Sequence, residues 1–317
     1  MRLSRSFAWS VLPLTVLLAA AGYAPAPSAS AVAVPDFTQG VITTRVSLPG
    51  NPYDKLLSQV DPAKGNVQEQ LQQLAGRLTA AEQQQLQAAA ADLSPAMTMG
   101  ALLLPRKGTL YCRGREVRAT TDALTYHLEN YFNQATNKGL LRLVAQAAPQ
   151  SVNYSYDAAS VEKTWQSIVV TDSDYTLRTT PETVLVAGYP SQKTTYTLKP
   201  GAQDTKPAGP GQFSGKPVAL DVWTSRQIPQ SLNFAHPVYV NQAYGITRLV
   251  VYFDKEHRQQ MRYEFATVQP RAVTDQELKV NTTAPLLDYT KDALQIGMQT
   301  MSLMLGGGTK EPAATDE

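Results

Sequence analysis

The stretch from 175 to 228 constrains the fold more than any other part of the chain. It holds three runs rich in threonine, valine and tyrosine, residues that are typical of β-strands. The first two runs flank an Ala-Gly-Tyr corner at 187–189, and the third carries Val-Trp-Thr at 222–224. Between the second and third runs, residues 200–217 are rich in glycine and proline, which predicts an exposed loop. The pattern predicts a hairpin followed by a third strand.

Further strands are predicted on both sides of this stretch. A β-branched run at 41–48 ends at a Pro-Gly turn and predicts the first strand. Short runs between 101 and 145, beginning with 101–104, are separated by turn residues and predict an antiparallel meander. Residues 246–253 and 260–268 predict two late strands, and the second alternates apolar with charged residues. Such alternation indicates one buried and one solvent-facing side.

Two segments are predicted to be helical, which makes the fold class α+β. Residues 67–93 consist almost wholly of Gln, Ala, Leu and Glu, which are good helix formers. Residues 285–305 place apolar side chains at helical spacing, and three glycines follow them. The members of this predicted stripe are Leu287, Leu294, Met298, Met301 and Leu305. The polar tail at 306–317 is expected to be disordered.

The N-terminus has the pattern of a secretory signal peptide over residues 1–31. Arg2 and Arg5 give it a positive start, residues 7–21 are mostly apolar, and Ala-Ser-Ala at 29–31 offers a cleavage site. The apolar run is short for a membrane anchor and is soon followed by prolines. We therefore expect a periplasmic or secreted protein with no transmembrane segment after cleavage.

Charge and cysteine content narrow the class of protein further. The chain has 28 basic and 26 acidic side chains, and signal cleavage removes Arg2 and Arg5 but no acid. The mature chain is therefore neutral, which gives no electrostatic case for nucleic acid as a partner. Cys112 is the only cysteine, so no internal disulfide can form. Its neighbours predict a buried thiol rather than a nucleophile.

The chain carries no recognisable catalytic or metal-binding motif. It lacks the zinc-protease, nucleophile-elbow, phosphate-loop and C-x-x-C patterns. His127, His236 and His257 lie in different predicted elements. Acidic residues at 172–174 and 254–256 lack the EF-hand ligand series and are interpreted as solvated turns. We predict a non-enzymatic protein without metal or cofactor. A hydrolase is the least favoured alternative. It stays open because a histidine that is distant in sequence could still lie beside a serine or a carboxylate in the folded protein.

Part of the 175–228 stretch resembles a family of secreted bacterial proteins of unknown function. The matching segments are ETVLVAGY at 182–189, TYT at 195–197, DVWT at 221–224 and Ile-Pro at 228–229. They are similar to the GLPGLI-like group, which is placed among the lipoprotein-carrier-like (LolA-like) half-barrels. Relatives often carry a cysteine two residues after the Gly-Tyr corner, where this chain has Ser191. Any role tied to that thiol is in doubt here.

The resemblance implies one domain over 36–305, built as a curved antiparallel sheet whose concave face is covered by helices. Proteins of this shape can hold a lipid or acyl chain between sheet and helices. We therefore expect a hydrophobic ligand inside the half-barrel, and the candidate lining residues are Trp223, Tyr263, Phe265, Met298 and Met301. The alternative is a structural or interaction protein of the cell envelope with a filled core and no ligand. A connected apolar cavity in the structure would favour the ligand-binding hypothesis over the filled core.

Overall fold

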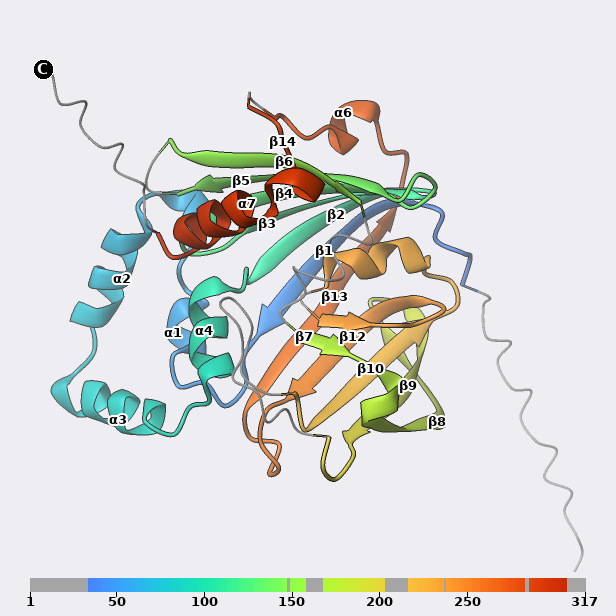
Figure 1. The fold of residues 1–317 in the computed structure, drawn as a ribbon. Coiled ribbons are helices and arrows are strands. Elements are labelled where there is room, and N and C mark those ends of the chain that lie inside the picture. Colours follow the sequence, from blue (N-terminus) through green and yellow to red (C-terminus); the bar gives the residue numbers. More distant parts are fainter. Residues whose placement is uncertain are drawn as a thin grey trace, which may run out of the picture. The chain divides into compact units, whose positions relative to one another are not determined.

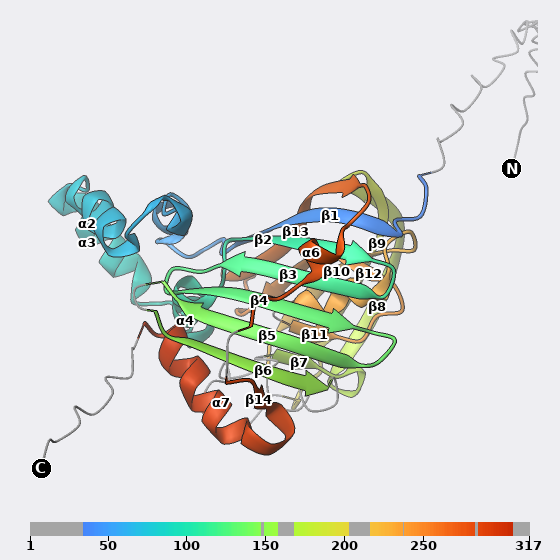
Figure 2. The same ribbon diagram turned by 90° about the horizontal axis from the view of Figure 1, so that it is seen from above.

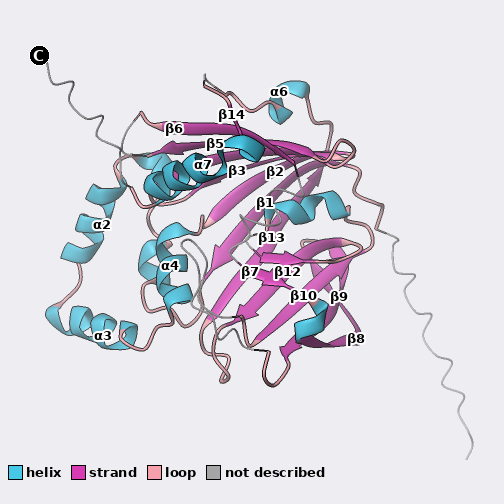
Figure 3. Cartoon of the chain, in the orientation of Figure 1, coloured by secondary structure: helices cyan, strands magenta, loops and turns pink. Residues whose placement is uncertain are grey.

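The computed structural model describes residues 34–146, 149–157, 168–202, 216–236, 238–282 and 285–306. The expected signal peptide, most of the 200–217 loop and all but the first residue of the expected disordered tail lie outside these residues. The chain is of the α+β class, and twelve of its strands form one open sheet in the order β14-β6-β5-β4-β3-β2-β1-β13-β12-β10-β9-β8. All neighbours in this sheet are antiparallel except β14 and β6. Figures 1 and 3 show the arrangement.

The strands of this sheet are β1 (Gln39–Ser47), β2 (Lys107–Arg113), β3 (Glu116–Asp122), β4 (Tyr126–Asn133), β5 (Lys138–Ala145), β6 (Ser151–Asp157), β8 (Tyr175–Val186), β9 (Tyr189–Leu198), β10 (Ala219–Ser225), β12 (Gly245–Tyr252), β13 (Gln260–Pro270) and β14 (Leu287–Asp288). Two short strands, β7 (Ile168–Val170) and β11 (Val238–Val240), pair in parallel apart from it. The helices are α1 (Asp54–Leu57), α2 (Val67–Gly76), α3 (Ala80–Ala90), α4 (Pro95–Leu103), α6 (Asp275–Leu278) and α7 (Tyr289–Met304), with short 3-10 turns η1 (Pro62–Lys64), η2 (Asp172–Asp174) and η3 (Gln230–Ala235).

The first strand joins two groups of strands that are each formed by neighbouring segments. On one side β1 pairs with β2, which begins the meander β2 to β6. On its other side β1 pairs with β13, so segments from opposite ends of the chain lie side by side in the middle of the sheet (Figure 1). The predicted meander and late strands are confirmed. The turn at Gly114 divides the predicted run 109–119 into β2 and β3.

The corner predicted at 187–189 is a tight turn between β8 and β9. Ala187 and Gly188 have φ values of 48° and 88°. Val186 pairs with Tyr189 across them, which makes this a two-residue hairpin loop. Positive φ at both loop positions matches the right-handed twist of the strands that they connect. The sequence therefore locates this hairpin correctly.

Strand β8 is one edge of the sheet and is poorly covered. Of its twelve residues, only Tyr175 and Val186 at the two ends are buried. The pairing with β9 is interrupted between Thr179 and Thr183, on either side of Pro181. A proline has no backbone N–H to donate, and for that reason it is confined to edges and bulges of sheets.

The predicted helix at 67–93 is two helices. Thr79 accepts a hydrogen bond from the backbone N–H of Glu82 and begins α3 with a capping box. Neither α2 nor α3 contains a buried residue, and both project away from the sheet (Figures 1 and 2). The predicted strand at 101–104 is wrong, because these residues continue α4 and its C-cap. Ser94 and Pro95 begin that helix rather than ending the previous one.

The described residues bury two apolar clusters. The larger one contains Ile42, Leu110 and Leu220 and lies among β1, β2, β10 and their neighbours. The smaller one lies among β4, β5, β6 and α7, which runs along β6 in Figure 2. Phe234 of η3 packs against both. Cys112 is buried in the larger cluster as predicted, and burial raises the pKa of its thiol to about 12.

Candidate functional site

A cavity of about 270 Å³, here called the apolar cavity, lies against the inward side of β1 to β5. The pairing register aligns Thr44, Gly108 and Thr121 on three successive strands. Two residues before Thr121 on β3, Ala119 is paired with Asn130 of β4. Thr44, Ala119 and Thr121 are among the small side chains that line the cavity. A methyl group on Gly108 would lie 2.8 Å from both Thr121 Cγ2 and Thr44 Oγ1, so this row is packed closely around a residue without a side chain.

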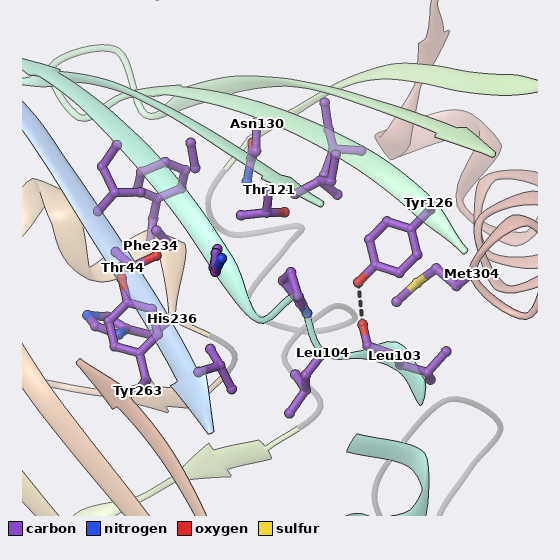
Figure 4. Close-up of a pocket in the computed structure, with 18 of the residues that line it drawn as sticks. Thr44, Leu103, Leu104, Thr121, Tyr126, Asn130, Phe234, His236, Tyr263 and Met304 are labelled. Carbon is purple, nitrogen blue, oxygen red and sulfur yellow. Dashed lines mark hydrogen bonds between the residues drawn. The ribbon is translucent and has the colours of Figure 1, made fainter. Parts of the chain in front are cut away.

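Three segments outside the sheet complete the wall of the apolar cavity. They are the end of α4, the 3-10 turn η3, and the last turns of α7, which contributes Met301 and Met304. The hydroxyl of Tyr126 donates a hydrogen bond of 2.5 Å to the carbonyl of Leu103 and so connects β4 to α4 (Figure 4). The residues contributed by these three segments are Leu103, Leu104, Phe234, Ala235, His236, Met301 and Met304.

The buried part of the lining of the apolar cavity is uncharged. His236 is buried, and burial lowers its pKa to about 3, so the imidazole is uncharged in ordinary buffers. Its ring packs edge-on against Tyr263 with centroids 4.3 Å apart, beside the cavity in Figure 4. Lys107 is the one charged residue among those that line the cavity, and it is exposed. The cavity therefore suits an uncharged guest.

Thr121 is expected to destabilise the unliganded protein. Its Oγ1 is buried and has no hydrogen-bond partner among the described residues. Leaving a buried polar group unpaired costs about 1–3 kcal/mol. Thr121→Val should therefore raise the free energy of unfolding, measured by urea titration, by about 1 kcal/mol. Thr195→Val is the matched control and should lower it, because Thr195 donates to Asp221 at 2.5 Å. No gain for Thr121→Val would refute the expectation.

Two of the five residues predicted to line a ligand site lie at the apolar cavity. Tyr263 and Met301 line it directly. Phe265 points to the same side of β13 as Tyr263, and the centroids of these two rings are 6.3 Å apart. Phe265 is packed within the larger cluster and does not line the cavity. The prediction for β13 was correct about direction, because residues two apart on a strand share a side.

Trp223 and Met298 do not face the apolar cavity. On β10, Leu220 and Val222 point inward, and Trp223 points to the other side. Its ring lies between the Lys193 ammonium, at 5.7 Å, and the Arg248 guanidinium, at 5.4 Å from the ring centroid. These cations stabilise the indole on the outer surface.

The predicted apolar stripe of the last helix is wrong as a description of its buried side. Leu294, Met298 and Leu305 are 78%, 62% and 55% exposed. The buried side of α7 instead carries Ile296 and Leu303, together with Tyr289 and Thr300. The physical reason is that α7 packs on β6 with the side that carries Ile296 and Leu303. Helical spacing alone is satisfied equally by the predicted stripe and by these buried residues.

The three histidines are on separate elements. His127 Nδ1 lies 2.7 Å from Asp122 Oδ1 on the outward side of β4, and this carboxylate raises the pKa of the imidazole. His257 is in the turn before β13 and stacks on Tyr252 with ring centroids 4.0 Å apart. Neither residue lines the apolar cavity. Among the described residues, no three potential metal ligands gather at one place.

Two further hollows exist on the described part of the chain. One of about 210 Å³ adjoins the apolar cavity and shares Asn130 and Phe234 with it. The other is an open groove of about 470 Å³ between α1 and α3. The groove is lined largely by exposed residues such as Lys55 and Glu82. We therefore regard the two adjoining cavities as the candidate site.

Comparison with known proteins leaves the family open. No family model matches the chain, and no curated protein matches it. Among solved structures it is similar to the one titled "Structure of PNGF-II in C2 space group", with 13% identity and a TM-score of 0.32. The match covers 62% of this chain but only 30% of that chain. A likeness at this level carries no argument, and it gives no support to the lipoprotein-carrier-like resemblance.

The sequence analysis missed most residues of the apolar cavity. A usable signal was present, because alternation in β4 places Tyr126, Leu128, Asn130 and Phe132 on the same side. Asn130 is a polar residue on that otherwise apolar side. A polar residue at a predicted inward position is informative, since burial requires a hydrogen-bond partner or an internal cavity.

Proposed function

We propose that the chain is an exported, non-enzymatic protein that binds a hydrophobic ligand in the apolar cavity. The observation that carries the proposal is a cavity of about 270 Å³ whose wall is mostly apolar and whose one charged residue, Lys107, is exposed. Burial of alkyl surface there contributes about 25 cal/mol for each Å² removed from water. Within the described residues, no helix is both long and apolar enough to cross a membrane.

The proposal includes the half-barrel geometry. The open sheet would curve as one lipoprotein-carrier-like domain, and α4, η3 and α7 would cover its concave side. Support comes from the wall of the cavity, to which five successive strands and these three segments all contribute. In this geometry the ligand replaces the core that a filled half-barrel would have.

The test is binding of the uncharged fluorescent probe N-phenyl-1-naphthylamine to the full mature protein. We expect saturable binding with a shift of emission to shorter wavelength. Ala119→Phe places a ring in the cavity from its strand side and should weaken binding at least tenfold, about 1.4 kcal/mol. Ala235→Leu fills it from η3 and should act in the same direction. Ala88→Phe, on the exposed side of α3, is the matched control.

Native mass spectrometry of protein purified without detergent gives a second readout. A removable extra mass that lipid analysis identifies would support the proposal. Absence of probe binding to a folded wild-type protein, judged by a cooperative thermal transition, would contradict it. Equal affinity of the wild type and both folded cavity variants would also contradict it.

A second candidate is a protein of the cell envelope that acts through its surface. The observation that favours it is the exposed apolar row Leu294, Met298 and Leu305 on α7 and its C-cap. Isolated exposed apolar residues are common, but a row along one helix is typical of a contact surface. Triple substitution of the row by glutamine should leave probe binding unchanged and should abolish any envelope association seen by sedimentation.

A further inference from the structure

The cavity beside the apolar cavity has a different chemistry. It is called the amide pocket and has a volume of about 210 Å³. Seven of the thirteen residues that line it are asparagine or glutamine, four are aromatic, and none is charged. The amide residues are Asn130, Gln134, Asn137, Gln230, Asn233, Asn241 and Gln242, and the aromatic ones are Phe132, Tyr156, Phe234 and Tyr239.

Two of these amide side chains, Asn233 and Gln230, are held in place by hydrogen bonds within the protein. The Asn233 side chain donates to the carbonyl of Tyr244 at 3.0 Å and accepts from the N–H of Ile246 at 2.8 Å. Gln230 Nε2 donates to the carbonyl of Gln242 at 2.8 Å. These bonds hold η3 against the segment after β11, so the wall of the pocket is formed before any ligand enters.

Other polar groups of the pocket remain available. Asn130 Oδ1 accepts from the Tyr156 hydroxyl at 2.6 Å, while Asn130 Nδ2 has no partner among the described residues. The Oε1 atoms of Gln134 and Gln242 also have no partner among the described residues, while their nitrogens donate to Gln230 Oε1 and to the Tyr196 hydroxyl. The pocket therefore offers both a donor and acceptors, which is the set that matches hydroxyl groups, since each hydroxyl can donate and accept.

The absence of charge in this lining selects against ionic groups. A carboxylate or phosphate would lose its hydration without meeting a cation from the lining residues, and an isolated charge is costly to bury. Aromatic rings supply the remaining wall, with Phe132 stacked on Phe234 at a centroid distance of 5.5 Å. Such rings pack against the C–H surface of a cyclic polyol, whose edges carry the hydroxyls.

The two cavities meet at Asn130 and Phe234, which line both. Figure 4 shows the side chain of Asn130 pointing from β4 toward Thr121, and its amide group lies where the two cavities meet. An extended molecule could therefore place an apolar part on one side of these residues and a polar part on the other. Volumes of about 270 and 210 Å³ together fall in the range of about 300–1,000 Å³ that is typical of small-molecule sites.

We propose that the two cavities form one site for an uncharged amphiphile, with its alkyl chain in the apolar cavity and a polyhydroxyl head group in the amide pocket. This inference rests on the proposed function. It adds a head-group class, and it assigns the selection of that class to Asn130 and Gln134.

The test compares octyl β-D-glucoside, octanoate and octylphosphocholine, each below its micelle concentration, as competitors of N-phenyl-1-naphthylamine on the full mature protein. The glucoside should compete at least tenfold better than either charged-head analogue. Gln134→Leu should weaken the glucoside at least fivefold and leave probe affinity within twofold, because Gln134 lines the amide pocket alone. Asn130→Asp should also weaken the glucoside at least fivefold. Asn130→Asp keeps the oxygen that accepts from Tyr156. Gln87→Leu, at an exposed position of α3, should change neither affinity.

The outcomes separate the two proposals. If the probe binds but the three competitors are equivalent, or a charged head wins, the head-group inference is wrong and the apolar cavity still stands. If the glucoside is preferred but neither amide variant weakens it, the amide pocket is not the head-group site. If the probe itself does not bind, both proposals fail.

Discussion

Replacing Arg118 with methionine is expected to lower the free energy of unfolding by about 3–5 kcal/mol. Arg118 Nη2 lies 3.0 Å from Glu129 Oε1 on the outward side of β3 and β4. The two side chains are only 13% and 8% exposed. Removing the guanidinium takes the nearer cation from a buried carboxylate and leaves it only His127 Nε2, at 3.6 Å, and a poorly compensated buried charge is strongly destabilising.

Both members of this pair also make hydrogen bonds to the segment around α6. The backbone N–H of Asn281 donates to Glu129 Oε2 at 3.3 Å, and Arg118 Nη1 donates to the carbonyl of Glu277 at 3.1 Å. The pair therefore attaches the segment around α6 to the sheet. Urea unfolding monitored by tryptophan fluorescence measures the change.

Two variants make the measurement specific. Arg258→Met is the matched control, because the side chain of Arg258 is 79% exposed although it forms ion pairs. This variant should change the free energy of unfolding by less than about 1 kcal/mol. The double variant Arg118→Met with Glu129→Met should recover most of the loss, because apolar replacement of both partners is often neutral. A loss for Arg118→Met no larger than that of the control would contradict the assignment.

Gly139→Ala is expected to destabilise the protein by about 3 kcal/mol, at the upper end of overpacking effects. Gly139 is paired with Tyr156 on β6 and Phe132 on β4. A methyl group at Gly139 would lie 2.0 Å from Cζ of Tyr156, well inside van der Waals contact. The ring must move, and its hydroxyl would then lose the 2.6 Å bond to Asn130.

This substitution also has a functional readout, because Tyr156 and Asn130 both line the amide pocket. Thermal denaturation gives the stability, and the glucoside competition assay gives the second effect. Gly297→Ala is the matched control, since nothing lies within 4 Å of a methyl group there and the position is inside α7. It should stabilise by up to about 1 kcal/mol. Equal effects of the two substitutions would refute the packing argument.

The strand pattern was predictable because it depends on local chemistry. Alternation and turn residues locate β1, the β2–β5 meander and the β8–β9 hairpin, since a strand with one buried side has period two. The order of strands in space was not predictable in this way. The pairing of β1 with β13 joins segments more than 200 residues apart, as the bond between Thr43 and Thr267 illustrates. No local pattern encodes such a partner.

The candidate site was predictable only in part, for the same reason. The inward direction of Tyr263 follows from alternation within β13 alone. The buried side of α7 is decided by its packing on β6. Met298 and Ile296 are both apolar and belong to two different sides of the helix, so the sequence of the helix does not say which side is buried. The part of the apolar cavity beside Thr121 depends on the register between strands. A void is a property of facing surfaces, so single residues do not reveal it.

The interruption at Pro181 has a consequence for self-association. An open sheet exposes unpaired N–H and C=O groups along its edge, which can act as a template for strands of other molecules. In β8 these groups form two separate pieces, 175–179 and 183–186, on either side of the irregularity. Each is no longer than an average strand of about five or six residues. A strand of a neighbouring molecule could form a regular ladder with only one of these two segments, because the irregularity interrupts the pairing register. The interruption therefore disfavours edge-to-edge polymerisation of the open sheet along β8.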